Sequence, residues 1–143
     1  MKRLLLLFIP TLCLVACDSE KTYTVGEDAF CTGLEETSPD TVYCVDGQEQ
    51  PINGLVQEYY PSGNIWREMN IKDGRENGEA REYFENGRLH VVANVVDGHA
   101  TGLSQLYNED GKLYMEMNWV NGEAQDIKVY DESGNIIQTS QDL

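Results

Sequence analysis

From Gly54 onward the chain repeats itself at a nearly constant interval, and this periodicity limits the folds that it can adopt. A tyrosine recurs at Tyr59, Tyr83, Tyr107 and Tyr130, and a turn glycine follows four residues after each of them. A second glycine, preceded by Asp or Asn, recurs at Gly74, Gly98 and Gly122. Columns that stay in phase over several units indicate an array of small supersecondary units stacked along one axis.

Each unit is predicted to be a β-hairpin. The glycines supply the positive φ that tight turns require. Short runs rich in β-formers, such as residues 65–71 and 89–96, lie between them. No segment between these glycines sustains the 3.6-residue apolar period of a helix. The chain is therefore predicted to be all-β, an elongated antiparallel meander of about eight to ten strands made of stacked hairpins.

The spacing of the glycines and tyrosines resembles the MORN-repeat variant, which is the repeat of the YwqK-type toxin–antitoxin antitoxin family. The pattern runs through residues 54–64, 78–88, 102–112 and 125–135, and the resemblance covers residues 52–139. It implies stacked hairpins in one twisted sheet that serves as a binding or scaffold module. The last unit has Gln125 where the others have glycine, as suits a capping repeat.

Residues 1–16 have the features of a signal peptide that is cleaved from the mature protein. Lys2 and Arg3 form a positive start, and an apolar run of eleven residues follows, from Leu4 to Leu14. This run is too short for a membrane-spanning helix, which needs roughly 20 apolar residues. Secretion is therefore predicted.

The stretch from Leu14 to Cys17, Leu-Val-Ala-Cys, resembles the lipobox of bacterial lipoproteins. The resemblance implies cleavage before Cys17 and acylation of its sulfur and its amine, which would anchor the chain stably to a membrane. Asp18 resembles the inner-membrane retention signal of enteric lipoproteins. We therefore expect a lipid-anchored, periplasm-facing protein of the bacterial cell envelope, with the inner membrane favoured. An ordinary signal peptide with a cysteine there by chance is the alternative.

The mature chain is predicted to divide into a lipidated tether, residues 17–40, and a repeat domain, residues 41–143. The tether is polar and acidic, with a hint of strand only at residues 23–25. Once Cys17 carries lipid, Cys31 and Cys44 remain as a pair in an oxidising compartment, which favours a disulfide. This disulfide would pin the end of the tether onto the first strand of the repeat domain, which is predicted at residues 41–46, and would shield its open edge. Two free thiols, or half of a metal site, are the alternatives.

The composition restricts the partners. The 143 residues contain 25 Asp and Glu against 10 Lys and Arg, which gives a formal net charge of −15. Such a surface repels nucleic acid and anionic lipid and favours cationic partners. The sequence contains no G-x-S-x-G, no H-E-x-x-H, no phosphate-binding loop and no dinucleotide glycine motif. We therefore expect no catalytic residue, no metal and no cofactor.

Pairing across the hairpins assigns the side chains to two faces of the predicted sheet. A mostly apolar core face carries residues such as Val56, Ile65, Met69 and Trp119. The other is a candidate binding face with the cross-strand pairs Tyr59/Trp66, Tyr83/His90, Tyr107/Tyr114 and Tyr130/Ile137 and the asparagine column Asn70, Asn94 and Asn118. An aromatic stripe beside amides suits a peptide or a glycan. Alternatively, the tyrosines pack between hairpins and the asparagines bond along the sheet, which a repeat also preserves.

These patterns favour a non-enzymatic, membrane-anchored lipoprotein that binds a protein or a cell-envelope component through its repeat sheet. An antitoxin or immunity protein that neutralises a basic toxin is one alternative, suggested by the family and by the acidic surface. An envelope enzyme of unrecognised type is another, although His90 and His99 have no cysteine or patterned carboxylate nearby in the sequence.

Overall fold

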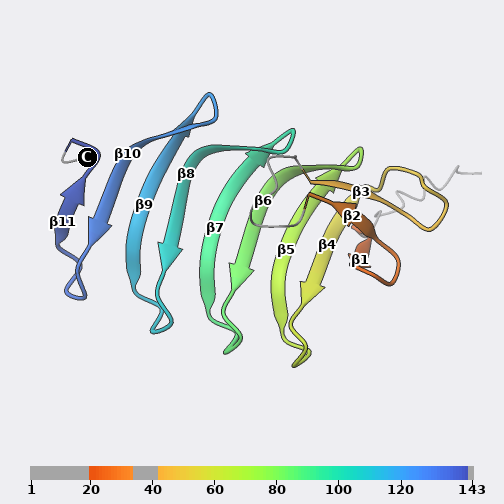
Figure 1. The fold of residues 1–143 in the computed structure, drawn as a ribbon, viewed down its shortest axis with the longest axis horizontal. Helices are drawn as coiled ribbons and strands as arrows, with labels where there is room; N and C mark the ends of the chain where they lie inside the picture. Colours follow the sequence, from red (N-terminus) through yellow and green to blue (C-terminus); the bar gives the residue numbers. More distant parts are fainter. Residues whose placement is uncertain (1–19, 34–41, 142–143) are drawn as a thin grey trace, which may run out of the picture.

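The computed structural model describes residues 20–33 and 42–141, which form eleven β-strands and no helix. The strands are β1 (Thr22–Thr24), β2 (Phe30–Thr32), β3 (Tyr43–Val45), β4 (Gly54–Tyr59), β5 (Ile65–Lys72), β6 (Arg75–Tyr83), β7 (Leu89–Val96), β8 (His99–Tyr107), β9 (Leu113–Val120), β10 (Glu123–Tyr130) and β11 (Ile136–Thr139). Strands β4 to β11 stand in one row and pair antiparallel with their chain neighbours (Figure 1). The predicted all-β array of stacked hairpins is confirmed. The signal peptide, Cys17 and Asp18 lie outside the described residues.

Two kinds of turn alternate along the row. The first consists of the two-residue loops Asp73-Gly74, Asp97-Gly98 and Asn121-Gly122. Both residues of each loop have positive φ, 50° and 79° in the first of them, as a type I′ hairpin turn requires. The second kind is wider and is closed by backbone bonds such as the one from Phe84 N to Arg88 O at 2.8 Å. Beside each wider turn the strand register shifts by one residue, a β-bulge.

The wider turns are tied to one another by side chains. Asn64 donates to the carbonyl oxygen of Glu85 at 2.9 Å, and Arg88 donates to that of Glu109 at 2.8 Å. Lys112 donates in the same way to Glu132 at 3.0 Å. Each hairpin is therefore attached to the next at its turn as well as along its strands.

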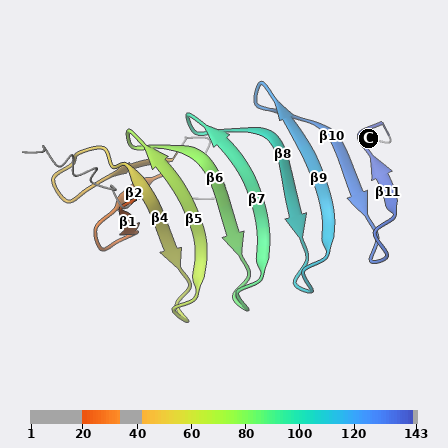
Figure 2. The same ribbon diagram turned by 180° about the vertical axis from the view of Figure 1, so that it is seen from behind.

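The structure differs from the predicted tether at residues 20–33, because this segment is folded. β1 pairs in parallel with β4 and covers its edge, with Tyr23 opposite Val56. Tyr23 is 7% exposed and Ala29 is fully buried, so apolar contacts hold the segment to the sheet. Figure 2 shows the N-terminal strands gathered at the β4 end of the row. We call the strands β1, β2 and β3 the N-terminal cap.

A disulfide joins Cys31 of β2 to Cys44 of β3, as predicted. It joins the end of the predicted tether to the strand predicted at residues 41–46, also as expected. That strand, β3, does not stand in the row of hairpins, because it pairs with β6, where Tyr43 lies opposite Arg75. The edge of β4 is covered by β1, so the disulfide braces the N-terminal cap internally.

The hydrophobic core lies between the N-terminal cap and one face of β4 and β5. It contains Tyr23, Ala29, Val42, Cys44, Ile52, Val56, Met69 and Ile71. We call the face that bears Val56, Met69 and Ile71 the core face. Towards β9 the residues on the same face, such as Met117 and Trp119, are only half-buried. The core is therefore concentrated at the N-terminal end of the row.

Candidate binding surface

The face opposite the core carries the four repeat tyrosines, and we call it the tyrosine face. Every one of them donates its hydroxyl to a side chain of the sheet. Tyr59 donates to Gln57, Tyr83 to Glu68, Tyr107 to Gln105 and Tyr130 to Glu116. Tyr83 and Tyr130 reach back to the preceding strand of the row at 2.8 and 2.7 Å. Tyr83 and Tyr130 therefore link neighbouring hairpins, which is the structural role weighed above, whereas Tyr59 and Tyr107 bond within their own strands.

The hydrogen bonds form one network that occurs twice, in hairpins separated by one other hairpin. In the first copy Glu68 accepts from Gln57 at one oxygen and from Tyr83 at the other, both at 2.8 Å. In the second copy Glu116 accepts from Gln105 and Tyr130 in the same manner. The hairpin between them has Arg81 at the glutamine position and Val92 at the glutamate position. The network therefore cannot form in the middle repeat, where Arg81 pairs with Glu79 instead.

These bonds fix the protonation of the groups that take part. Hydrogen bonds from Tyr130 and from Gln105 hold the pKa of Glu116 below its ordinary value of 4.5. The bond to Glu116 in turn raises the pKa of Tyr130 above 10.0. Burial, and then the bond to Glu68, raises the pKa of Tyr83 in the same direction. At neutral pH Tyr83 and Tyr130 are therefore protonated and Glu116 is ionised, so neither of these two tyrosines is activated as a nucleophile.

A hollow of about 550 Å³ opens on the tyrosine face between the first and second wider turns. We call it the tip hollow. It is lined by Tyr59, Gly63, Asn64, Ile65, Glu68, Tyr83, Asn86 and Gly87. Two aromatic rings and one isoleucine supply apolar surface, while the amides and Glu68 supply polar groups. Such a mixture suits a polar ligand that also offers an apolar side.

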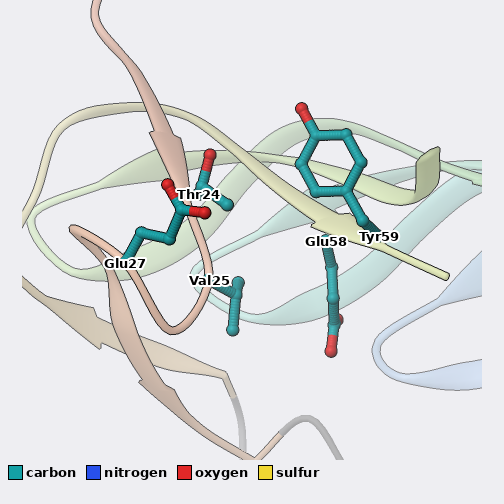
Figure 3. A pocket seen from close by; sticks show the side chains of 5 residues that line it. All are labelled: Thr24, Val25, Glu27, Glu58 and Tyr59. Carbon is teal, nitrogen blue, oxygen red and sulfur yellow. The ribbon is translucent and has the colours of Figure 1, made fainter. Parts of the chain in front are cut away.

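A second hollow of about 540 Å³ lies where β1 ends and leaves the edge of β4 uncovered. Figure 3 shows Glu58 and Tyr59 projecting to opposite sides of β4 at this point. Thr24, Val25 and Glu27 of the cap complete the lining. It is lined by two carboxylates, those of Glu27 and Glu58, and by a single aromatic ring, that of Tyr59, so it offers a ligand less apolar contact than the tip hollow.

The structure does not form the predicted pairs Tyr59/Trp66 and Tyr83/His90. The bulge at the end of β4 pairs Tyr59 with Ile65 and leaves Trp66 as the extra residue. The Trp66 ring lies instead 6.3 Å from the ring of Tyr60. Ile65, which was expected on the core face, joins Tyr59 in the tip hollow. A one-residue slip exchanges the side chains of a strand between the two faces, and the bulge applies this slip locally.

The same shift occurs in the next hairpin, where Tyr83 pairs with Leu89. The His90 ring packs against Phe84, with 4.3 Å between ring centroids. In the third hairpin Tyr107 pairs with Leu113 rather than with Tyr114, which is half-buried. The predicted aromatic stripe is therefore divided, and only its tyrosine column stays on the tyrosine face.

The asparagine column is not uniform. Asn70 donates to the backbone oxygen of Glu79 at 2.7 Å and so bonds along the sheet. Asn94 is exposed and Asn118 is half-buried. His99 is exposed, and its Nδ1 lies 3.0 Å from the carbonyl oxygen of Asp97 in the adjoining turn. These residues lie outside the tip hollow.

Sequence reasoning missed Gln57, Gln105 and Ile65 as members of this surface. The two glutamines were detectable, because both stand two residues before a repeat tyrosine and each faces a glutamate across the hairpin. Ile65 was not, because its position on the tyrosine face depends on a bulge.

Across residues 20–33 and 42–141, no group of three or more His, Cys, Asp or Glu side chains is placed to hold a metal ion. The same part of the chain contains no helix that could cross a membrane. The surface therefore offers aromatic, amide and carboxylate groups as its means of recognition.

The comparison with protein families matches the repeated part of the chain. Residues 52–73, 76–97 and 100–121 match the model of the MORN repeat variant. The curated proteins and the solved structures contain no significant match to the chain. The first matched segment begins two residues before β4, and the other two begin at the second residue of β6 and of β8. Each segment ends at the first residue of a type I′ turn, so the matched units follow the structural ones closely. Three segments of the chain are therefore similar to the MORN repeat variant, a non-catalytic repeat type that generally serves as a binding module.

Proposed function

We propose that this protein is a non-enzymatic, membrane-anchored lipoprotein of the cell envelope that binds a protein or an envelope component through its tyrosine face. The tip hollow carries the proposal, because it places the rings of Tyr59 and Tyr83, Ile65 and the carboxylate of Glu68 around one opening. The Glu68 oxygens already accept bonds from Gln57 and Tyr83, which holds the wall of the hollow in place before a ligand arrives.

The net charge of −15 supports a cationic partner. An antitoxin or immunity protein that neutralises a basic toxin is therefore the second candidate. It uses the same face and differs in the identity of the partner. Binding to such a partner would weaken as salt is added, because screening reduces attraction between opposite net charges.

The binding test uses a lipid-free form, residues 18–143, immobilised and exposed to envelope extract. The double variant Tyr59→Ala/Ile65→Ala should lose the captured partner, because it removes apolar walls of the tip hollow. The matched control Tyr107→Ala/Leu113→Ala makes the same kind of change two hairpins further along the row and should retain it. Direct titration with the purified partner should show at least a tenfold difference in Kd, roughly the loss of one good aromatic contact.

Equal affinity of the two double variants would contradict the tip hollow as the binding site. Equal melting temperatures of the two variants are the control for folding. A partner that is captured regardless of both double variants would move the search to the exposed acidic turns.

The anchoring part of the proposal depends on Cys17. Cys17→Ser should leave an unprocessed precursor that takes up no radioactive palmitate, because the acylated thiol is absent. Wild-type protein labelled in parallel is the reference, and Cys13→Ser is the matched control that should label normally. Labelling of the Cys17→Ser variant at the wild-type level would exclude lipidation at this residue.

A further inference from the structure

Four charged side chains meet on the core face of β4, β5 and β6. Glu58 and Glu82 are the pairing partners of Arg67 on either side, and Glu76 approaches Arg67 from the start of β6. Arg67 lies 3.5 Å from Glu76 and 3.6 Å from Glu82. The side chain of Glu76 is 7% exposed and that of Arg67 is 18% exposed. We call these four residues the carboxylate cluster.

The carboxylate cluster is short of hydrogen-bond partners. Oε2 of Glu58, Nε of Arg67 and Oε1 of Glu76 are buried and have no hydrogen bond within the described part of the chain. Buried polar atoms without a hydrogen bond are costly, and the ion pairs of Arg67 with Glu76 and Glu82 replace only part of the solvation that these groups lose. Three carboxylates around one guanidinium also leave two excess negative charges in a partly dry site. A bound proton removes one of these charges and turns an acceptor oxygen into a donor.

Strand β7 supplies no charge that could compensate those of the carboxylate cluster. On the core face, its side chains opposite β6 are Val91, Ala93 and Val95, which are apolar. Asp97, in the following turn, accepts a bond from Asn77 at 3.3 Å. From the cap, Tyr43 pairs with Arg75, whose side chain is exposed beside Lys72.

The remaining titratable groups near the cluster lie at the wider turns. Tyr60 and Glu85 lie on the side of Glu82. Burial is the main cause that raises the pKa of Tyr60, and the charges of Glu85 and Glu82 raise it further. Both histidines are engaged elsewhere, His90 against Phe84 and His99 at the Asp97 carbonyl. The proton acceptors of the cluster are therefore its own carboxylates.

We propose that the carboxylate cluster is a proton-uptake site centred on Glu76, which becomes protonated while exposed carboxylates are still ionised and thereby stabilises the first two repeats at mildly acidic pH. Burial raises the pKa of Glu76 above its ordinary value of 4.5, although Arg67 acts in the opposite direction. Burial raises the pKa of Glu58 in the same way.

The sign of the pH dependence follows from linkage. A carboxyl whose folded pKa exceeds its unfolded pKa binds protons more tightly in the folded state. Its contribution to stability is complete below the unfolded pKa and is lost as the pH rises through the folded pKa. Asp46, Asp131 and Glu116 have pKa values below the ordinary ones, which are 3.8 for the aspartates and 4.5 for the glutamate. Their contribution to stability has the opposite sign and is lost as the pH falls below these ordinary values. Between pH 4.5 and neutrality, the carboxylate cluster should therefore dominate the difference between wild type and a Glu76 variant.

Carbon-13 NMR titration of the glutamate carboxyls in the wild-type protein is the primary test. We expect the Glu76 carboxyl to titrate above pH 4.5 and the exposed Glu123 to serve as the internal reference. A Glu76 titration at or below 4.5 would overturn the proposal, and this measurement requires no variant to fold.

Thermal unfolding from pH 4 to pH 8 is the second test. Glu76→Gln should melt at a higher temperature than wild type at neutral pH, and the difference should shrink towards zero near pH 4. Glu123→Gln, an exposed change on β10, should follow the wild-type curve at every pH. A Glu76→Gln difference that is independent of pH, or that has the opposite sign at neutral pH, would contradict proton uptake by this residue.

Discussion

Met69→Ala should lower the free energy of unfolding by about 3 kcal/mol, which is the usual loss for a large apolar side chain removed from a closed core. Met69 is fully buried between the sheet and the N-terminal cap, with Val56 opposite it on β4. The residues around it belong to four different strands and to a disulfide, so the site has little freedom to collapse. Urea unfolding followed by circular dichroism measures the loss.

Met117→Ala is the matched control for this experiment. Met117 is the counterpart of Met69 two hairpins later, on the same face and at the same place in its hairpin, but it is only half-buried. Its truncation should cost about 1 kcal/mol, because the removed atoms already contact water. Equal losses at the two positions would show that the core extends evenly along the row and is not concentrated under the cap.

Gly54→Ala should also cost about 3 kcal/mol and should release β1 from the sheet. Gly54 has φ +145°, and a Cβ at this position would overlap the carbonyl oxygen of Lys21 and lie 3.1 Å from the ring of Tyr23. That carbonyl accepts the backbone hydrogen bond from Leu55 at 3.0 Å. The Leu55 amide should therefore exchange with deuterium much faster in the variant, along with a lower melting temperature.

Gly102→Ala is the control for this experiment, because it tests the backbone strain of an alanine at positive φ without an overlap between its Cβ and neighbouring atoms. Gly102 occupies the same column of the repeat with φ +66°, but a Cβ there would meet nothing within 4 Å. Only the left-handed backbone is penalised, at about 1 kcal/mol. If Gly54→Ala cost no more than Gly102→Ala, the close approach of β1 would not limit the residue at position 54.

The hairpins and their turns were predictable because each is determined by neighbours in the sequence. Asp73-Gly74 and its two counterparts favour a two-residue type I′ loop, and this sequence signal occurs three times in the repeat. The pairing of Cys31 with Cys44 followed from the number of cysteines, and the structure confirms it.

The N-terminal cap was not predictable in the same way. Thr22–Thr24 is three residues long and pairs in parallel with β4, a strand that lies well beyond it in the sequence. Local pattern carries no information about such a partner. The polar, acidic composition of residues 18–38 pointed to a tether, whereas the buried side chains of Tyr23 and Ala29, the pairing of β1 with β4 and the disulfide of Cys31 hold part of it in place.

The candidate site was predicted in part for a related reason. Alternation along a strand placed Tyr59 and Tyr83 on one face, and the structure brings both into the tip hollow. The same alternation misplaced Trp66 and Ile65, because it assumes an uninterrupted ladder through to the turn. A bulge breaks that assumption by one residue and exchanges the two side chains between the faces.

The two copies of the Tyr–Gln–Glu network have a consequence for how such a repeat array gains units by duplication. Gene duplication of a single hairpin unit would keep every turn. It would also place two units of the same kind side by side, either two with Arg81 and Val92 or two with Gln57 and Glu68. Duplication of two units would keep the alternation and add one further complete network. In the present chain the backbone pattern recurs with every hairpin, whereas the hydrogen-bonded pattern of the tyrosine face recurs only with every second one.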